Sequence, residues 1–175
     1  SFGIEQTTRQ SDEKLWCNDS QLESDLSLGF PSTYIENIAE RISLYRELDG
    51  LSNEDTLLEY QKRLIDRFGK MPEEAEQLLN VVRLRWLCCK MGIEKVMLKQ
   101  ERLTIIFTRT NDKYWQSDVF GKIVEYVYSR PQRCRMAEDK DRNGKSTGRR
   151  YATIQQVKTI SGALTLLNKI LSGEK

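Results

Sequence analysis

The sequence contains no histidine among its 175 residues. Histidine is the commonest general acid or base near neutral pH and the commonest protein ligand of metal ions. Its absence excludes most catalytic schemes in which a neighbouring base activates a serine or cysteine nucleophile. Catalysis by carboxylates or lysine stays open in principle, but we expect a domain that is not an enzyme and that holds no cofactor and no metal.

Cysteine is also scarce, and its four positions do not suggest a metal site. Cys17, Cys88, Cys89 and Cys134 include no C-x-x-C pair, and no histidine is present to complete a zinc site. Cys88 and Cys89 are adjacent, so on a helix their side chains point in different directions. We expect all four to be reduced thiols, which is the usual state in a cytoplasmic protein.

Long apolar runs are missing as well. No run approaches the roughly 18 apolar residues that span a bilayer, and the first residues lack the basic start and apolar stretch of a signal peptide. These absences predict a cytoplasmic protein without a membrane partner. The beginning of the chain is polar and aperiodic, so residues 1–15 are expected to be a linker or the remnant of a preceding domain, and residues 16–175 the folded domain.

The first half of the domain has mainly helical periodicity. Alternation over residues 22–28 predicts a strand, which ends where a proline follows. Spacings of three and four then predict helices over residues 32–48, from about 52 to 68, and over 72–91. The apolar stripe of the first helix consists of Ile35, Ile38, Ile42 and Tyr45.

The second half returns to strand-like patterns. The predicted elements are a β-hairpin at 93–98 and 103–107, a helix at 114–128, strands at 133–137 and 150–154 on either side of a charged loop at 138–149, and a helix at 157–171. The predicted fold class is α+β: an N-terminal strand and helical subdomain, followed by a mostly antiparallel sheet with packed helices.

Two motifs suggest chemistry but lack the context that it needs. Gly144-Lys145-Ser146-Thr147 resembles the end of a phosphate-binding loop, yet Asp139 occupies the position of the required first glycine, and a strand follows in place of a helix. Glu73, Glu74 and Glu76 could be paired catalytic carboxylates, but they occupy the first turn of a helix, where acids are expected because of the helix dipole.

The charge is distributed unevenly along the chain. The net charge is +2, whereas residues 101–175 carry 15 Lys and Arg against 8 Asp and Glu. The basic run at residues 130–150 could contact nucleic acid phosphates, although a solvated hairpin is the favoured interpretation, because acids interrupt the run and only Tyr151 nearby could stack on a base. The candidate nucleic-acid contacts are Arg133, Arg135, Arg142, Lys145, Arg149 and Arg150.

The segment from Leu64 to Gly69 is the most distinctive local feature. A helix ends here, with Leu64 and Phe68 on its apolar side and Gly69 as its stop. Asp66 and Arg67 are then expected to project at a corner of fixed geometry, where an arginine could bind a partner's carboxylate in a bidentate manner. The alternative is a local salt bridge that ties the helix end to the next helix, and the residues alone leave both readings open.

The run LIDRFGKMPEEAEQLLNVVRLRWLCCKMGIEKV, residues 64–96, closely resembles the C-terminal domain of transcription-repair coupling factors. The matching features are Ile65 to Gly69, Pro72, the pair Leu78-Leu79, the tripeptide Arg83-Leu84-Arg85 and the segment Met91-Gly92-Ile93-Glu94-Lys95 that follows the helix. Upstream, residues 30–35 and 41–48 resemble the entry strand and first helix of that family. The resemblance covers residues 22–96 well and the rest of the chain loosely.

The resemblance implies a function in the context of a longer protein. Members of the family are ATP-driven DNA translocases that displace stalled RNA polymerase and recruit excision repair through UvrA; the motor domains precede this domain. The C-terminal domain is non-catalytic and docks on the UvrB-like N-terminal module of the same protein, where it masks the UvrA-binding surface. The resemblance carries this docking role to Asp66 and Arg67. One turn earlier the family commonly has an acid where this sequence has Arg63, which we include in the expected interface.

Overall fold

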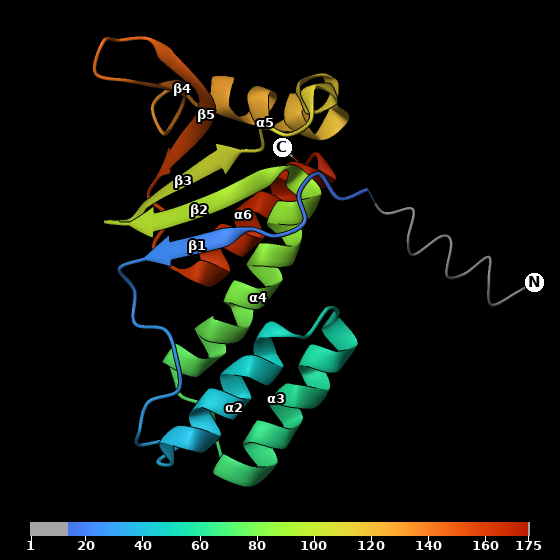
Figure 1. Ribbon diagram of the computed structural model, residues 1–175, viewed down its shortest axis with the longest axis vertical. Coiled ribbons are helices and arrows are strands. Elements are labelled where there is room, and N and C mark those ends of the chain that lie inside the picture. The colour runs from blue at the N-terminus through green and yellow to red at the C-terminus, as the bar shows by residue number, and fades with distance from the viewer. Residues whose placement is uncertain (1–13, 175) are drawn as a thin grey trace, which may run out of the picture.

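The structure is a computed structural model that describes residues 14–174, and it confirms the predicted α+β fold. A sheet lies at one end, and the long helix α4 connects it to a pair of helices at the other end (Figure 1). The predicted linker, residues 1–15, falls almost entirely outside the described residues.

The strands are β1 (Gln21–Ser24), β2 (Ile93–Lys99), β3 (Arg102–Phe107), β4 (Cys134–Lys140) and β5 (Ser146–Gln155). The helices are α2 (Ile38–Asp49), α3 (Glu54–Phe68), α4 (Glu73–Met91), the short 3-10 helix η1 (Asp112–Gln116), α5 (Asp118–Tyr128) and α6 (Ile160–Ser172).

The sheet is mostly antiparallel, with the strand order β1-β2-β3-β5-β4. Only β1 runs parallel to its neighbour, with Leu22 opposite Val96 of β2. β1 ends at Ser24, before the predicted end at residue 28. The Ser24 hydroxyl accepts a hydrogen bond from the backbone N–H of Leu26 (3.1 Å), and such a local bond competes with continued strand pairing.

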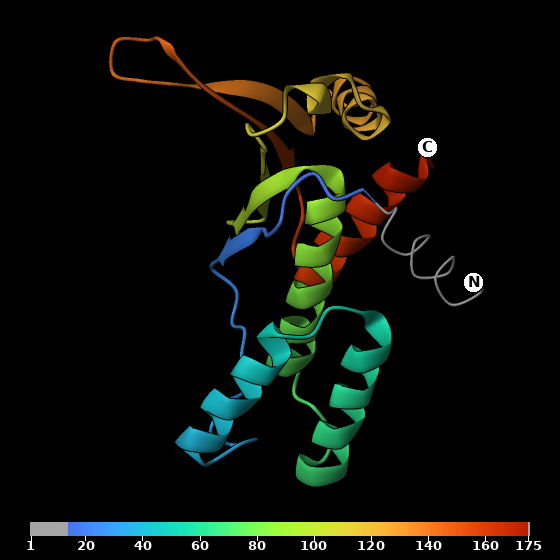
Figure 2. The same ribbon diagram turned by 45° about the vertical axis from the view of Figure 1, so that its right-hand side comes forward.

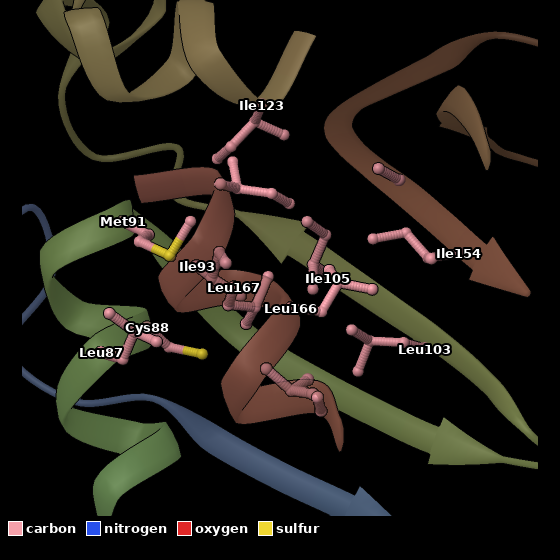
Figure 3. Packing of buried hydrophobic residues seen from close by; sticks show 14 of the residues in the cluster. Leu87, Cys88, Met91, Ile93, Leu103, Ile105, Ile123, Ile154, Leu166 and Leu167 are labelled. Carbon is pink, nitrogen blue, oxygen red and sulfur yellow. The ribbon is translucent and has the colours of Figure 1, made fainter. Parts of the chain in front are cut away.

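The larger hydrophobic core lies between the sheet and helices α4, α5 and α6. Cys88 of α4, Leu167 of α6 and Ile105 of β3 lie close together in this core, as do Leu103 and Ile154 of neighbouring strands (Figure 3). Successive strand residues point to opposite faces of a sheet, so this core uses every second residue of β3 and β5. Each fully buried side chain of this size contributes roughly 1.5–3 kcal/mol.

The end of α4 packs against a buried tyrosine. Gly92 takes a left-handed conformation (φ 72°) and donates its N–H to the carbonyl of Cys88. The Tyr114 ring lies directly over it, since a Cβ at Gly92 would be 2.1 Å from that ring. The Tyr114 hydroxyl donates to the carbonyl of Met91 (2.6 Å), and burial raises the pKa of Tyr114. The turn from α4 into β2 therefore requires glycine.

A second, smaller core lies among α2, α3 and the N-terminal half of α4 (Figure 2). Leu57, Tyr60 and Leu64 form the inward side of α3, as the sequence predicts. Ala75 and Leu79 of α4 face them. The three helices thus form a helical subdomain with its own apolar interior.

Helix α4 contributes to both cores. Leu79 and Val82 belong to the smaller core, whereas Leu84, Leu87 and Cys88 belong to the larger one. A helix that is covered on all sides carries apolar residues around its whole circumference. α4 is therefore the element that holds the two parts of the domain together.

The prediction for α2 was wrong in its start and in its buried face. Asn37 caps the helix by accepting the N–H of Glu40, so the helix begins at Ile38 and not near residue 32. Ile35 is buried ahead of the helix, whereas Ile38 is 65% and Ile42 46% exposed. Leu48 lies on the inward side of the helix instead. The predicted stripe is therefore mostly an outer surface.

The segment predicted as a charged loop, 138–149, largely forms a β-hairpin. β4 continues to Lys140 and β5 begins at Ser146, with Glu138 paired to Arg150. The hairpin projects beyond the rest of the sheet (Figure 1). Its turn is closed by the Asp141 carboxylate, which accepts the backbone N–H groups of Asn143 and Lys145.

The four cysteines are free thiols, as predicted. Within residues 14–174 no helix is long and apolar enough to cross a membrane. The same residues include no cluster of acidic and cysteine side chains suited to a metal ion.

Candidate protein-interaction site

The corner at the end of α3 is held by several contacts. Gly69 stops the helix with φ 87° and donates its N–H to the carbonyl of Ile65 (2.9 Å). The Tyr34 hydroxyl donates to the carbonyl of Gly69 (2.8 Å), and the rings of Tyr34 and Phe68 lie 5.8 Å apart. These contacts give the side chains of the last turn of α3 a defined position.

The two interface arginines form ion pairs with α2. Arg63 pairs with Glu47, and Arg67 pairs with Glu40. The guanidinium of Arg67 also lies 5.0 Å from the ring centre of Phe68. The predicted local salt bridge therefore exists, but it joins α3 to the preceding helix and not to the next one. Both arginines remain largely exposed, so most of their N–H donors are available to a partner.

Asp66 lies on the outward side of α3. It is exposed, and its carboxylate has no hydrogen bond or ion pair with any other described residue. In particular, Asp66 and Arg67 do not pair with each other, because consecutive residues on a helix point in different directions. Asp66 is thus the one predicted interface residue whose charge is not matched within the described part of the domain.

Two exposed apolar side chains share this outward side, and neither was among the interface residues predicted from the sequence. Leu58 is 48% and Ile65 43% exposed. They are seven residues apart, so they lie two turns apart on one side of α3, next to Asp66. The signal in the sequence was that each directly follows a residue of the inward stripe, Leu57 and Leu64. We define the α3 outer face as Leu58, Ile65 and Asp66, with Arg63 and Arg67 at its edge.

Beneath the α3 outer face, a hydrogen bond from a buried side chain joins α3 to α2. The buried Tyr60 hydroxyl donates to the carbonyl of Leu44 in α2 (2.7 Å). Burial raises the pKa of Tyr60, so the phenol keeps its proton and remains a donor. The α3 outer face therefore lies on a helix pair that is joined by this hydrogen bond.

The six basic residues predicted as nucleic-acid contacts do not lie together. Arg142 and Lys145 are exposed at the hairpin turn. Arg150 faces the helical side, 4.7 Å from the ring centre of Trp115 and 3.5 Å from Glu138. The remaining three, Arg133, Arg135 and Arg149, line a hollow on the opposite side of the sheet. The structure thus divides the predicted basic patch among three places.

These features define an α+β domain in which a helical subdomain and a mixed sheet share one long helix. Residues 24–117 match the family model of the TRCF domain, so this chain belongs to the TRCF domain family.

Relatives of known identity agree with this assignment. The chain is 34% identical over 102 residues to the transcription-repair-coupling factor of Rickettsia prowazekii, a match that covers 58% of this chain and 9% of that protein. It is 31% identical over 99 residues to the transcription-repair-coupling factor of Escherichia coli, covering 57% of this chain and 9% of that protein. The matched segments are thus a small part of these relatives.

A solved structure shares the fold along nearly the whole chain. The crystal structure of the C-terminal domain of a transcription-repair coupling factor matches with a TM-score of 0.65 and 19% identity, covering 90% of this chain and 96% of that one. This likeness extends beyond the segment that the family model matches. The expected resemblance and fold class are therefore confirmed.

Proposed function

We propose that this domain is the regulatory docking module of a transcription-repair coupling factor. In this proposal the domain binds the UvrB-like N-terminal module of the same protein and covers its UvrA-binding surface. The observation that carries the proposal is the α3 outer face, on which two exposed apolar side chains lie beside an unmatched carboxylate. Family membership supplies the context, because the matched relatives are transcription-repair-coupling factors.

The composition of the α3 outer face suits a protein partner. Leu58 and Ile65 would lose their contact with water on docking, which stabilises a complex by roughly 25 cal/mol for each Å² of apolar surface buried. Asp66, Arg63 and Arg67 would surround them as a charged rim, the usual arrangement of a reversible interface. Such a rim contributes chiefly to specificity and to the rate of association.

The ion pairs with α2 prepare the two arginines for binding. Glu40 and Glu47 hold Arg67 and Arg63 in position before a partner arrives. A side chain that is already ordered loses less conformational entropy on association, which lowers the cost of binding. We expect the partner to present a basic group to Asp66 and carboxylates to the two arginines.

The wider activities belong to the parent protein in this proposal. The parent would be an ATP-driven DNA translocase that binds RNA polymerase, UvrA and DNA, and the present domain would regulate it without a cofactor of its own. No ATP hydrolysis is expected from the isolated domain. A turnover that scales with the concentration of the domain would contradict this part of the proposal.

The docking is tested by calorimetric titration of this domain with the separately expressed N-terminal module of its parent. Asp66→Arg should weaken binding about tenfold or more, because it reverses an unmatched interfacial charge without removing any contact within the domain. Lys113→Glu changes an exposed charge on η1, at the far end of the molecule, and should leave the affinity unchanged. Wild-type affinity in Asp66→Arg would show that the α3 outer face is not the docking surface.

Arg67→Glu provides a second variant with a different internal consequence. It should also weaken docking, but it places a carboxylate beside Glu40 and therefore destabilises the α2–α3 pair as well. Comparing the unfolding midpoints of the two variants separates the loss of docking from the loss of stability. Asp66→Arg should unfold as the wild type does.

A further inference from the structure

One face of the sheet has no helix against it in the described part of the chain. Helices α4, α5 and α6 all lie on the other side (Figure 2). The uncovered face is formed by the alternate residues that point away from the larger core. The register places Arg135, Thr153 and Thr104 side by side across β4, β5 and β3, with Ile106 next to Tyr151.

This open sheet face contains a hollow of about 570 Å³. Arginines surround it from three strands and from the loop before β4, and a single carboxylate, Asp139, lies among them. The Asp139 carboxylate is already engaged, since it accepts a hydrogen bond from the Thr147 hydroxyl (3.3 Å). The arginines around the hollow are Arg102, Arg133, Arg135 and Arg149.

Much of the hydrogen-bonding capacity of these arginines is unused. Within residues 14–174, the side chains of Arg102 and Arg135 have no hydrogen bond and no ion pair. Arg149 lies 3.7 Å from the carboxylate of Glu94, but its Nε is buried without a hydrogen-bond partner. Arg133 donates its Nε to the carbonyl of Gln155 (2.8 Å), which holds it at the edge of the hollow. The Arg149 side chain is 39% exposed, so guanidinium donors other than Nε can reach an acceptor in the hollow.

The remaining lining suits a flat ring. Tyr151 is half-buried in the middle of β5, and Ile106 is buried beside it. Nucleic-acid bases stack on aromatic side chains and on the planes of arginine guanidinium groups, while forked arginine donors bind phosphate oxygens. Thr104 and Thr153 add hydroxyl groups to the same surface.

We propose that the open sheet face binds a short segment of single-stranded nucleic acid. The phosphates lie along Arg102, Arg135 and Arg149, and a base stacks on Tyr151. The bases of a duplex are stacked within the helix and do not reach such a face, whereas those of a single strand do. This activity goes beyond the proposed docking and uses a different surface, so either proposal can fail without the other.

The proposal differs from a general attraction between nucleic acid and the basic hairpin. It includes Arg102, which lies outside the basic run of the sequence, and it omits Arg142 and Lys145 at the hairpin turn. Arg150 is omitted too, because it faces Trp115 on the covered side. Charge reversal at Arg102 should therefore weaken binding, whereas charge reversal at Arg142 and Lys145 should not.

The test is fluorescence anisotropy of a labelled single-stranded oligothymidylate of about 12 nucleotides, long enough for one small binding site, titrated with this domain at several salt concentrations. About 0.7 counterions are released for each phosphate that a protein neutralises on a single strand. Three to four arginines should therefore give a slope of about −2 to −3 in log affinity against log salt. The double variant Arg102→Glu/Arg135→Glu should weaken binding at least about tenfold and reduce that slope by about 1.4.

The matched control is Arg142→Glu/Lys145→Glu, which changes the net charge equally at the hairpin turn. It should alter the affinity less than about threefold, because these residues lie outside the hollow. Tyr151→Leu should weaken binding roughly fivefold or more, whereas Tyr151→Phe should retain it, since stacking needs only the ring. Circular dichroism confirms that each variant is folded before it is titrated.

Three results would overturn the proposal. One is the absence of binding at low salt, and another is an equal loss in the hairpin control. The third is displacement of the oligonucleotide by an acidic peptide or by duplex DNA at lower concentration than by the unlabelled single strand. The last result would assign the face to a protein or to a duplex instead.

Discussion

The helical subdomain and the sheet expose surfaces of opposite character. Of the seven large hydrophobic side chains exposed in the described part of the chain, five lie on α2 and α3. The open sheet face instead presents arginines, threonines and one tyrosine. An apolar surface with a charged rim suits a protein partner, and a basic surface suits an anionic one. The sequence alone offered protein docking and nucleic-acid binding as alternatives. The comparison assigns the two proposed functions to two different surfaces.

The two regions also differ in the size of their cores, although they share α4. The larger core includes buried side chains from β2, β3, β4 and β5, with Leu22 of β1 packed against it, whereas the smaller one rests on three helices and the segment before α2. A region with fewer buried contacts opens more easily than its neighbour. We infer that the helical subdomain is the part of the domain that can change conformation at low cost.

The largest effect is expected at the junction of the two regions. Gly92→Ala would place a methyl group within the Tyr114 ring and force a left-handed backbone on alanine. Strain and overpacking together should cost about 3 kcal/mol or more. Chemical denaturation measures this loss, and both regions should be destabilised because α4 ends there. Gly121→Ala in α5 is the matched control: no atom would meet the new Cβ, so it should stabilise by about 0.5–1 kcal/mol.

A cavity in the smaller core should act more locally. Leu57→Ala removes a fully buried side chain and should cost about 2–5 kcal/mol. Native-state hydrogen exchange should then show faster exchange in α2 and α3, with little change in β3 and β5. Leu103→Ala, at an equally buried position in the larger core, should raise exchange throughout. Identical exchange patterns in the two variants would mean that the domain opens as one unit.

The smallest effect is expected from an exposed ion pair near the boundary. Arg85 contacts Asp19 ahead of β1 (2.8 Å) and Asp49 at the end of α2 (2.9 Å). The hydrogen bond from Arg85 lowers the pKa of Asp19. The stabilisation is therefore present above the ordinary pKa of an aspartate and is lost as the pH falls through the lowered value. Because the Asp19 carboxylate is largely exposed, the stabilisation amounts to less than about 1 kcal/mol.

Asp19→Asn removes the titrating group and keeps its size. Its unfolding free energy should lie slightly below that of the wild type at pH 7, and the difference should disappear at strongly acidic pH. A difference that persists unchanged across this range would show that the carboxylate charge contributes nothing.

The sequence predicted the elements well where their periodicity was local. The glycine stop of α3 at Gly69 and the inward position of Leu64 follow from backbone conformation and from spacing, and the structure confirms both. The buried side of α2 was wrong, because Ile38 and Ile42 have helical spacing but face away from α3. Periodicity shows that a helix has an apolar face, but not which neighbour covers it.

The candidate sites could be predicted only in part for a related reason. Arg63, Asp66 and Arg67 are close in the sequence, so one helix places them together. The open sheet face depends on β5 lying between β3 and β4, and this arrangement brings Arg102 beside Gln155. Which distant strands pair is determined by the whole fold, so a local sequence pattern cannot predict the strand order.

The most direct test of the regulatory account is the binding of UvrA to the full-length parent protein, measured with and without Asp66→Arg. The account predicts tighter binding of UvrA to the variant, because weaker docking exposes the masked surface more often. The affinity of the isolated N-terminal module for UvrA sets the upper limit. If UvrA binds the variant and the wild-type parent equally, while calorimetry shows that docking has been lost, then the domain docks without masking and the central claim is wrong.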